Sequence, residues 1–218
     1  MITANIATMK CRADVLPAAV ASLIHQVDTV RIYGNDYLPV VPGAECYKGT
    51  DYTDRSKFYF IQPGEIYLTC DDDLIYPPDY VDTIKNAMDR YPESVITFHG
   101  RKLRGKGLNY YHGHEVFACL RDVSGDHLVH VPGTGVSAIN NDKFLPDVIK
   151  YKYDRMADVL LGLECAKAGR SIVCIGHRLG WILPLNGKNP IYDRERIAPF
   201  IQNKLTDEIY DILQQSKK

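Results

Sequence analysis

Three consecutive aspartates, Asp71, Asp72 and Asp73, directly follow the apolar run of residues 66–70. Alternate side chains of an extended chain point to the same side, so the carboxylates of Asp71 and Asp73 are expected to converge. Crowded like charges cost free energy unless a cation neutralises them. Mg²⁺ or Mn²⁺ prefers carboxylate oxygens together with substrate phosphates, and can stabilise a diphosphate leaving group. The triplet therefore predicts a metal site; the alternative is that these acids solvate a loop and begin the next helix.

The elements that must position this triplet follow from the apolar periodicity. Strands are expected at residues 2–8, 30–33, 66–70, 95–98, 128–131, 136–139 and 171–175, and helices at 13–26, from 77 onward, at 155–168 and at 197–213. Residues 38–54, with room for one short strand, and 101–114 are expected to be loops. Strand and helix alternate before strands dominate, which predicts an α/β fold with a mostly parallel central sheet flanked by helices and a mixed second half. Ligands of such sheets bind beyond the carboxyl ends of the strands, here in the loops after Thr8, Tyr33, Cys70 and Ile175.

The composition is typical of a globular protein. Of the 218 residues, 45% are hydrophobic and 24% are charged, and 26 Lys and Arg against 27 Asp and Glu give a formal net charge of −1. This balance argues against nucleic acid as the main partner. The six cysteines form no C-x-x-C pair, residues 1–10 carry no signal-peptide pattern, and no window approaches about 18 uninterrupted apolar residues. We therefore expect a reduced, cytoplasmic protein without a transmembrane segment.

Residues 67–81, YLTCDDDLIYPPDYV, resemble the D-x-D segment of nucleotide-sugar glycosyltransferases of the GT-A fold, in particular the large inverting family two. The opening segments 5–8, 16–23 and 26–28 with Arg12 are similar to that family's first strand and helix, and residues 133–135 and 156–158 match its usual order of parts. The resemblance implies a single GT-A-like domain over 1–218, with a Rossmann-like sheet and a small mixed second sheet. It assigns 1–100 to nucleotide binding, 101–192 to the acceptor and catalysis, and 193–218 to a terminal helix.

The resemblance also implies roles for individual residues. Asp71 and Asp73 would hold Mn²⁺ or Mg²⁺, and His177 would be an extra metal ligand. Asp71 and Asp72 would also contact the nucleotide. The remaining contacts to a nucleotide-sugar donor, expected to be a UDP-sugar, fall to Thr8, Arg12, Asp36 and Lys57. The implied partner is a glycan or glycolipid acceptor in surface polysaccharide or glycolipid biosynthesis, with the protein in the cytoplasm or in peripheral contact with the inner face of the membrane.

Inversion at an anomeric carbon needs a base that removes the acceptor proton. Asp158 lies near the start of the helix expected at 155–168, away from its apolar stripe, and the resemblance places the family's catalytic acid there. Asp154 is the reserve candidate. The alternative interpretation of Asp158 is an ordinary acid in the first turn of a helix.

Several other residues have two open interpretations. His177 either binds metal or caps the strand before it, and His99 is a weaker candidate for contact with the donor sugar. The basic, aromatic loop 100–112 either contacts anionic headgroups or a phosphate-bearing acceptor, or is a solvated segment. Lys188 is a candidate for a lid over the diphosphate.

Two other functions remain open. A nucleotidyltransferase shares the sheet and the metal-binding acids, but residues 8–12 lack the glycines that such an enzyme carries after its first strand. A catalytically silent carbohydrate-binding or partner domain is the second alternative, against which the set Asp71, Asp73 and Asp158 argues.

Overall fold

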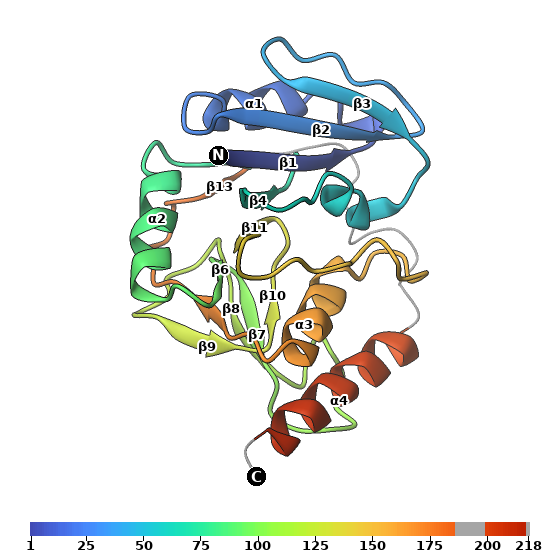
Figure 1. Cartoon of the computed structure of the whole chain (residues 1–218), viewed down its shortest axis with the longest axis vertical. Coiled ribbons are helices and arrows are strands. Elements are labelled where there is room, and N and C mark those ends of the chain that lie inside the picture. The colour runs from blue at the N-terminus through green and yellow to red at the C-terminus, as the bar shows by residue number, and fades with distance from the viewer. Residues whose placement is uncertain (186–198, 217–218) are drawn as a thin grey trace.

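The computed structural model describes residues 1–185 and 199–216, which form an α/β fold around one large mixed sheet (Figure 1). The sheet has eight strands in the order β3-β2-β1-β4-β11-β6-β12-β9. Their bounds are Ile2–Thr8 (β1), Thr29–Asn35 (β2), Glu45–Gly49 (β3), Ile66–Cys70 (β4), Val95–Thr97 (β6), His127–Val129 (β9), Val136–Asn140 (β11) and Ile172–Cys174 (β12).

The sheet divides into a parallel half and a mixed half. Strands β3, β2, β1 and β4 pair in parallel, as the alternation of strands and helices predicts. Strand β11 then pairs antiparallel with both β4 and β6, and β9 pairs antiparallel with β12. The α/β fold and the parallel pairing of the first strands are confirmed. The central sheet as a whole is mixed, not mostly parallel, because β11 and β9 pair antiparallel while β12 pairs parallel with β6.

Helices cover both faces of the sheet. The helices α1 (Leu16–Leu23) and α2 (Tyr80–Arg90) pack their apolar sides into one core cluster, and α3 (Ala157–Lys167) and α4 (Pro199–Gln215) pack into another. In β6, Val95 belongs to one cluster and the next residue, Ile96, to the other, as the pleat of a strand requires. The described residues thus form three layers, helices on either side of the sheet.

Two smaller sheets flank the large one. Strands β10 (Val131–Pro132), β7 (Gly100–Lys102) and β8 (Glu115–Phe117) form an antiparallel sheet, and β13 (Leu183–Pro184) pairs antiparallel with β5 (Leu74–Ile75). Part of the segment 101–114, expected to be loop, is therefore a strand. The optional strand in 38–54 exists as β3, and short 3₁₀ helices lie at η1 (Lys10–Arg12) and η2 (Thr53–Phe58).

Strand β2 is longer than its sequence suggests. The run Gly34-Asn35-Asp36 was expected to stop it after Tyr33, but Gly34 and Asn35 continue the pairing with β3. A Cβ on Gly34 would lie 2.1 Å from the Tyr37 carbonyl oxygen, so this glycine permits a close backbone approach instead of ending the strand.

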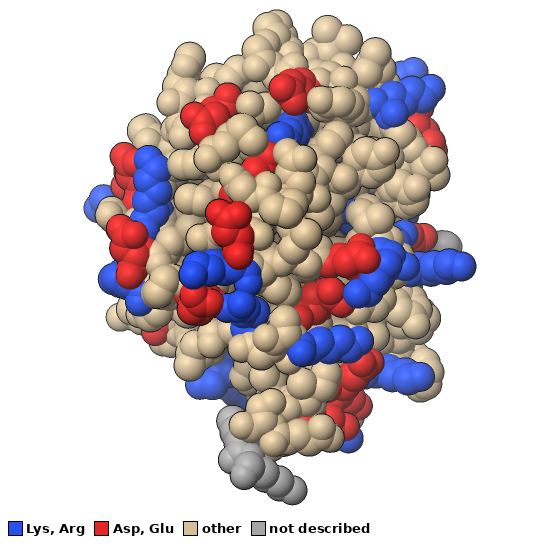
Figure 2. All heavy atoms as spheres, viewed as in Figure 1, with Lys and Arg blue, Asp and Glu red and all other residues tan. Residues whose placement is uncertain are grey.

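The surface has no dominant charge on the face shown in Figure 2, where basic and acidic side chains are interspersed. Within the described residues, no helix combines the length and the apolar character needed to cross a membrane.

Candidate functional site

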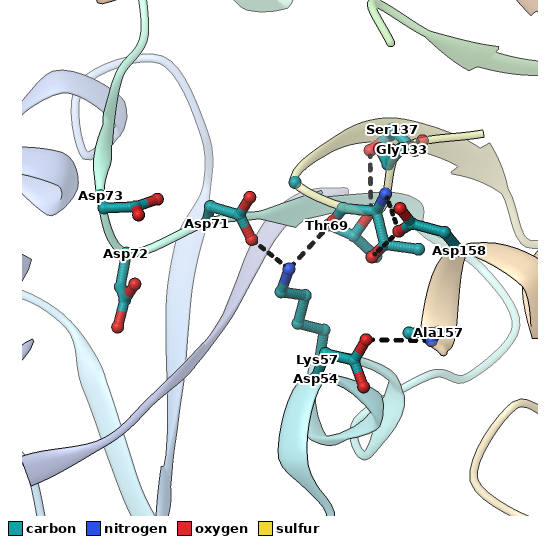
Figure 3. Close-up of polar contacts among 12 residues, drawn as sticks. Asp54, Lys57, Thr69, Asp71, Asp72, Asp73, Gly133, Ser137, Ala157 and Asp158 are labelled. Carbon is teal, nitrogen blue, oxygen red and sulfur yellow. Dashed lines mark hydrogen bonds and ion pairs between the residues drawn. The ribbon is translucent and has the colours of Figure 1, made fainter. Parts of the chain in front are cut away.

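Most of the predicted site residues lie at the carboxyl ends of the central strands, and Figure 3 shows Lys57, the triplet and Asp158 there. The triplet Asp71, Asp72 and Asp73 follows β4 directly, and Thr8 ends the neighbouring strand β1. The two short helices η1 and η2 bring Arg12 and Lys57 to this edge. Asp158 arrives from the second half of the chain, in the first turn of α3.

Asp72 and Asp73 are bound from the β1 side. The Thr8 hydroxyl donates a hydrogen bond to Asp72 Oδ2 at 2.7 Å, and the Tyr37 hydroxyl donates to Thr8 Oγ1 at 3.2 Å. The Arg12 guanidinium lies 3.5 Å from Asp72 Oδ1 and forms an ion pair with Asp73. Burial raises the pKa of Asp72 to about 6, although Thr8 and Arg12 favour its ionised form.

Asp71 is bound from the opposite direction. The Lys57 ammonium, in a residue only 5% exposed, forms an ion pair with Asp71 and lies 3.4 Å from the Thr134 carbonyl oxygen. Burial lowers the pKa of Lys57, but the attraction of Asp71 outweighs it and the net pKa is raised, so this amine is charged. In Figure 3 the Asp72 side chain points away from those of Asp71 and Asp73.

A glycine makes room for the Asp71 carboxylate. A Cβ on Gly135, just before β11, would lie 2.0 Å from Asp71 Oδ2, so a larger residue at this position would displace the carboxylate. The Tyr76 hydroxyl bridges the same two segments, at 2.7 Å from the Asp71 amide nitrogen and 2.7 Å from the Gly135 carbonyl oxygen. The end of β4 and the start of β11 are thus fixed against each other.

Asp158 is oriented through one of its two oxygens. Its Oδ1 accepts hydrogen bonds from the Thr134 amide at 2.8 Å and from the Thr134 hydroxyl at 2.6 Å. No hydrogen bond to Oδ2 is seen from the described residues. Thr134 therefore fixes the position of Asp158, while its carbonyl oxygen contacts Lys57 and its neighbour Gly135 lies against Asp71.

Asp54 completes the acidic cluster and was not among the residues singled out from the sequence. Its Oδ2 accepts a hydrogen bond from the Ala157 amide at 3.0 Å, at the N-terminus of α3 (Figure 3). Burial, with a smaller contribution from the negative charge of Asp158, raises the pKa of Asp54 to about 6. The signal that could have found it is the i, i+3 spacing to Lys57, which places both residues on one side of a 3₁₀ helix.

The cluster carries an excess of negative charge. Five carboxylates, those of Asp54, Asp71, Asp72, Asp73 and Asp158, face the two cations Arg12 and Lys57, which leaves three formal negative charges when all are ionised. Such an excess favours binding of a cation, and carboxylate oxygens suit Mg²⁺ or Mn²⁺. Within residues 1–185 and 199–216, no group of three His, Cys, Asp or Glu side chains is assembled that could hold a metal by itself.

Asp36 and His177 lie apart from these contacts. Asp36 is exposed, with a left-handed backbone (φ 61°), and its neighbour Asn35 instead binds η2 through the Thr53 carbonyl and the Ser56 hydroxyl. The ring nitrogens of His177 face two carbonyl oxygens, that of Ile175 at 2.7 Å and that of Ala118 at 3.3 Å. The structure thus places His177 in backbone contacts after β12.

A groove of about 870 Å³ is lined in part by residues that follow the triplet along the chain, from Ile75 to Asp79. It runs between the end of α1 and the start of α2, and its walls include His25, Tyr76, Pro77, Arg178 and Trp181. None of the five carboxylates of the acidic cluster lines it. We place the functional site at the acidic cluster, because charged side chains converge there, whereas the groove is mostly apolar.

Comparison with known proteins finds no protein-family model and no curated protein that matches this chain. Lys188, the candidate lid residue, lies outside the described residues.

Proposed function

We propose that the protein is a metal-dependent glycosyltransferase that moves a sugar from a UDP-sugar to an acceptor hydroxyl with inversion. The main observation behind the proposal is that Asp158 lies near the acid triplet, at the carboxyl ends of the central strands. In α/β sheets this edge is where ligands bind. The resemblance of residues 67–81 to the D-x-D segment supports the same function.

The donor set suits the proposed Mn²⁺ or Mg²⁺. Asp71 and Asp73 would hold it, and the excess negative charge of the cluster would be neutralised. When bound, such an ion neutralises the diphosphate of the donor and so stabilises it as a leaving group. The Arg12 and Lys57 cations already lie beside these carboxylates, where both could also bind phosphate oxygens.

Asp158 would act as the base through Oδ2. The Thr134 hydrogen bonds fix Oδ1 and orient the carboxylate, so Oδ2 can take the proton of the acceptor hydroxyl. The acceptor oxygen forms its bond to the anomeric carbon as the bond from that carbon to the diphosphate breaks. The electron pair of the broken bond leaves with the nucleotide diphosphate.

The proposed acceptor is a glycan or glycolipid hydroxyl. Its biological setting, surface polysaccharide or glycolipid biosynthesis at the inner face of the membrane, follows from the resemblance alone and is part of the same proposal.

Release of UDP from a panel of UDP-sugars, with Mn²⁺, with Mg²⁺ and with a chelator, tests this function. We expect slow hydrolysis of one donor that the chelator abolishes and that Asp73→Asn lowers by at least about 10–100-fold, because losing a direct ligand should cost no less than losing a group that only orients one. Asp82→Asn, an exposed change on α2, is the control and should leave the rate unchanged. Hydrolysis that is insensitive both to metal and to Asp73→Asn would contradict the proposal.

A donor-binding domain without turnover is the second candidate. It is favoured by the ion pairs of Arg12 and Lys57, which partly neutralise the triplet without metal. Calorimetry that detects UDP binding with no hydrolysis of any donor, and no effect of Asp158→Asn in an acceptor assay, would support this function in place of the enzyme.

A further inference from the structure

Arg101, on β7, is stacked on aromatic rings, and no acidic side chain in the described part of the chain pairs with it. Its guanidinium carbon lies 4.4 Å from the centre of the Tyr110 ring and 5.8 Å from that of Tyr111. Its Nε is buried and has no hydrogen-bond partner, and no carboxylate of the described residues forms an ion pair with it. A half-buried guanidinium in this state is a ready anion-binding group.

The stack lies beside the proposed base. Arg101 pairs with Val131 between β7 and β10, and the chain then continues to Thr134, which holds Asp158. Burial raises the pKa of Tyr110, and both Asp158, which raises it further, and Arg101, which lowers it, act on this hydroxyl. Tyr110 therefore has the proposed base and the guanidinium as neighbours.

The aromatic support is held in place by α4. The Tyr110 amide donates to Asn203 Oδ1 at 3.0 Å, and the Gly107 amide donates to Asp207 Oδ1 at 2.8 Å. Lys106 pairs with Asp211 at 2.6 Å. Because Tyr110 is fixed from this helix and only 4% exposed, the guanidinium on it is held ready before any ligand binds.

Arg101 differs from the cations of the proposed donor side. Arg12 and Lys57 are engaged by the acid triplet. Arg101 comes from the second half of the chain, contacts the Tyr110 hydroxyl, and forms no ion pair with a carboxylate of residues 1–185 or 199–216. A second anion beyond the donor diphosphate would therefore find an arginine whose positive charge no carboxylate of these residues neutralises.

We propose that Arg101 binds an anionic group, a carboxylate or a phosphate, on the acceptor whose hydroxyl reaches Asp158. The assignment to an acceptor rests on the proposed glycosyltransferase function; the anion site itself does not. The planar guanidinium donates two parallel hydrogen bonds to either group, and the tyrosine rings keep it in one orientation. The protein would thus select acidic acceptors over neutral ones.

Binding can be tested on the full chain without any turnover. The probes are methyl glucoside, methyl glucuronide and inorganic phosphate. Each is titrated into the protein, and its dissociation constant is obtained from the change in NMR chemical shifts. We expect methyl glucuronide, phosphate or both to bind about tenfold or more tightly than methyl glucoside. Preference for the glucuronide indicates a uronate-bearing glycan acceptor, and preference for phosphate a phosphate-bearing one.

Three variants locate the effect. Arg101→Met should abolish the preference, and Arg101→Lys, which keeps the charge and the fold but loses the planar fork, should weaken anion binding at least threefold, by roughly 0.65 kcal/mol. Lys102→Met removes a neighbouring exposed charge and should change nothing. Equal binding of all three probes, or an equal loss in Lys102→Met and Arg101→Met, would overturn the anion site.

The outcome is separable from that of the proposed function. An Arg101-dependent anion site in a protein that hydrolyses no UDP-sugar would remove the acceptor assignment and the glycosyltransferase proposal together, and would leave the anion site standing. Donor hydrolysis without an Arg101-dependent preference would leave the enzyme and remove this inference.

Discussion

The two oxygens of the Asp158 carboxylate have different surroundings, and this difference allows a clean test of the base. In Asp158→Asn the amide oxygen can still accept both hydrogen bonds from Thr134, so the local structure is kept. The amide cannot take a proton, and we expect kcat for sugar transfer to fall by about 10²–10⁴-fold. KM for the donor should stay within about twofold, because this side chain binds no donor group in the proposal.

Asp154→Asn is the matched control for that change. Asp154 is the reserve candidate, lies four residues earlier and is paired with Arg55 at 2.7 Å, with its side chain 64% exposed. Transfer kinetics should be almost unchanged in this variant. A loss in Asp154→Asn as large as that in Asp158→Asn would remove the role given to Asp158.

Asp72 links the site to the pH dependence of stability. Its pKa is raised by burial from 3.8 to about 6, so the folded state holds this proton more tightly than the unfolded chain does. The free energy of unfolding therefore falls as pH rises from about 4 to 6, and two pKa units correspond to roughly 3 kcal/mol from this group.

Urea unfolding of the natural chain and of Asp72→Asn, at pH 4 and pH 7.5, measures that contribution. The stability of the variant relative to the natural chain should increase by roughly 3 kcal/mol between the two pH values, since asparagine does not titrate. Acids that do not interact with Asp72 are common to both proteins and cancel in the comparison, whereas Asp71 and Asp73 interact with it and contribute to the difference. A difference between the two proteins that is independent of pH would contradict this account.

At the scale of elements, the approach of β11 to β4 fixes where the Asp71 carboxylate lies. In Gly135→Ala the new methyl group would overlap Asp71 Oδ2, 2.0 Å away, and push the carboxylate from its place beside Lys57. Mn²⁺ affinity, measured by electron paramagnetic resonance with and without UDP, should fall about 10–100-fold. Circular dichroism should show the same secondary structure, because the collision is with a side chain at the edge of the sheet.

Gly105→Ala provides the comparison for that variant. A Cβ at Gly105 meets only a Leu108 methyl, at 3.8 Å, an ordinary contact. Mn²⁺ binding should be unchanged there. If Gly135→Ala binds Mn²⁺ as well as Gly105→Ala does, Asp71 is not a ligand.

The elements also show how far the sequence leads. Strand β4 has the bounds 66–70 that its apolar run predicts. A continuous apolar run that ends at three charged residues clearly marks where a buried strand stops. The link between Asp54 and α3 was not visible, since a 3₁₀ helix inside a Pro- and Tyr-rich segment has no apolar period. The ion pairs of Lys57 and Arg12 with the triplet depend on how distant strand ends meet, and no local pattern encodes that.

At the scale of the whole molecule, the fold brings the residues of the proposed donor site and those of the proposed acceptor site together. The first half supplies the triplet, Arg12 and Lys57, and the second half supplies Asp158 and Arg101. The two halves meet where β11 inserts antiparallel beside β4. The helix α4 packs on α3 and also holds the loop that supports Arg101, so its docking affects both the core and the acceptor side.

Ile209→Ala tests that docking. Ile209 is fully buried on α4 and packs toward Gly162 of α3, so its truncation should lower the free energy of unfolding by about 2–5 kcal/mol. Phe200→Ala, on the same helix and 78% exposed, should change it by no more than about 0.5 kcal/mol. Urea unfolding monitored by circular dichroism measures both, and equal effects of the two changes would show that α4 does not depend on this core.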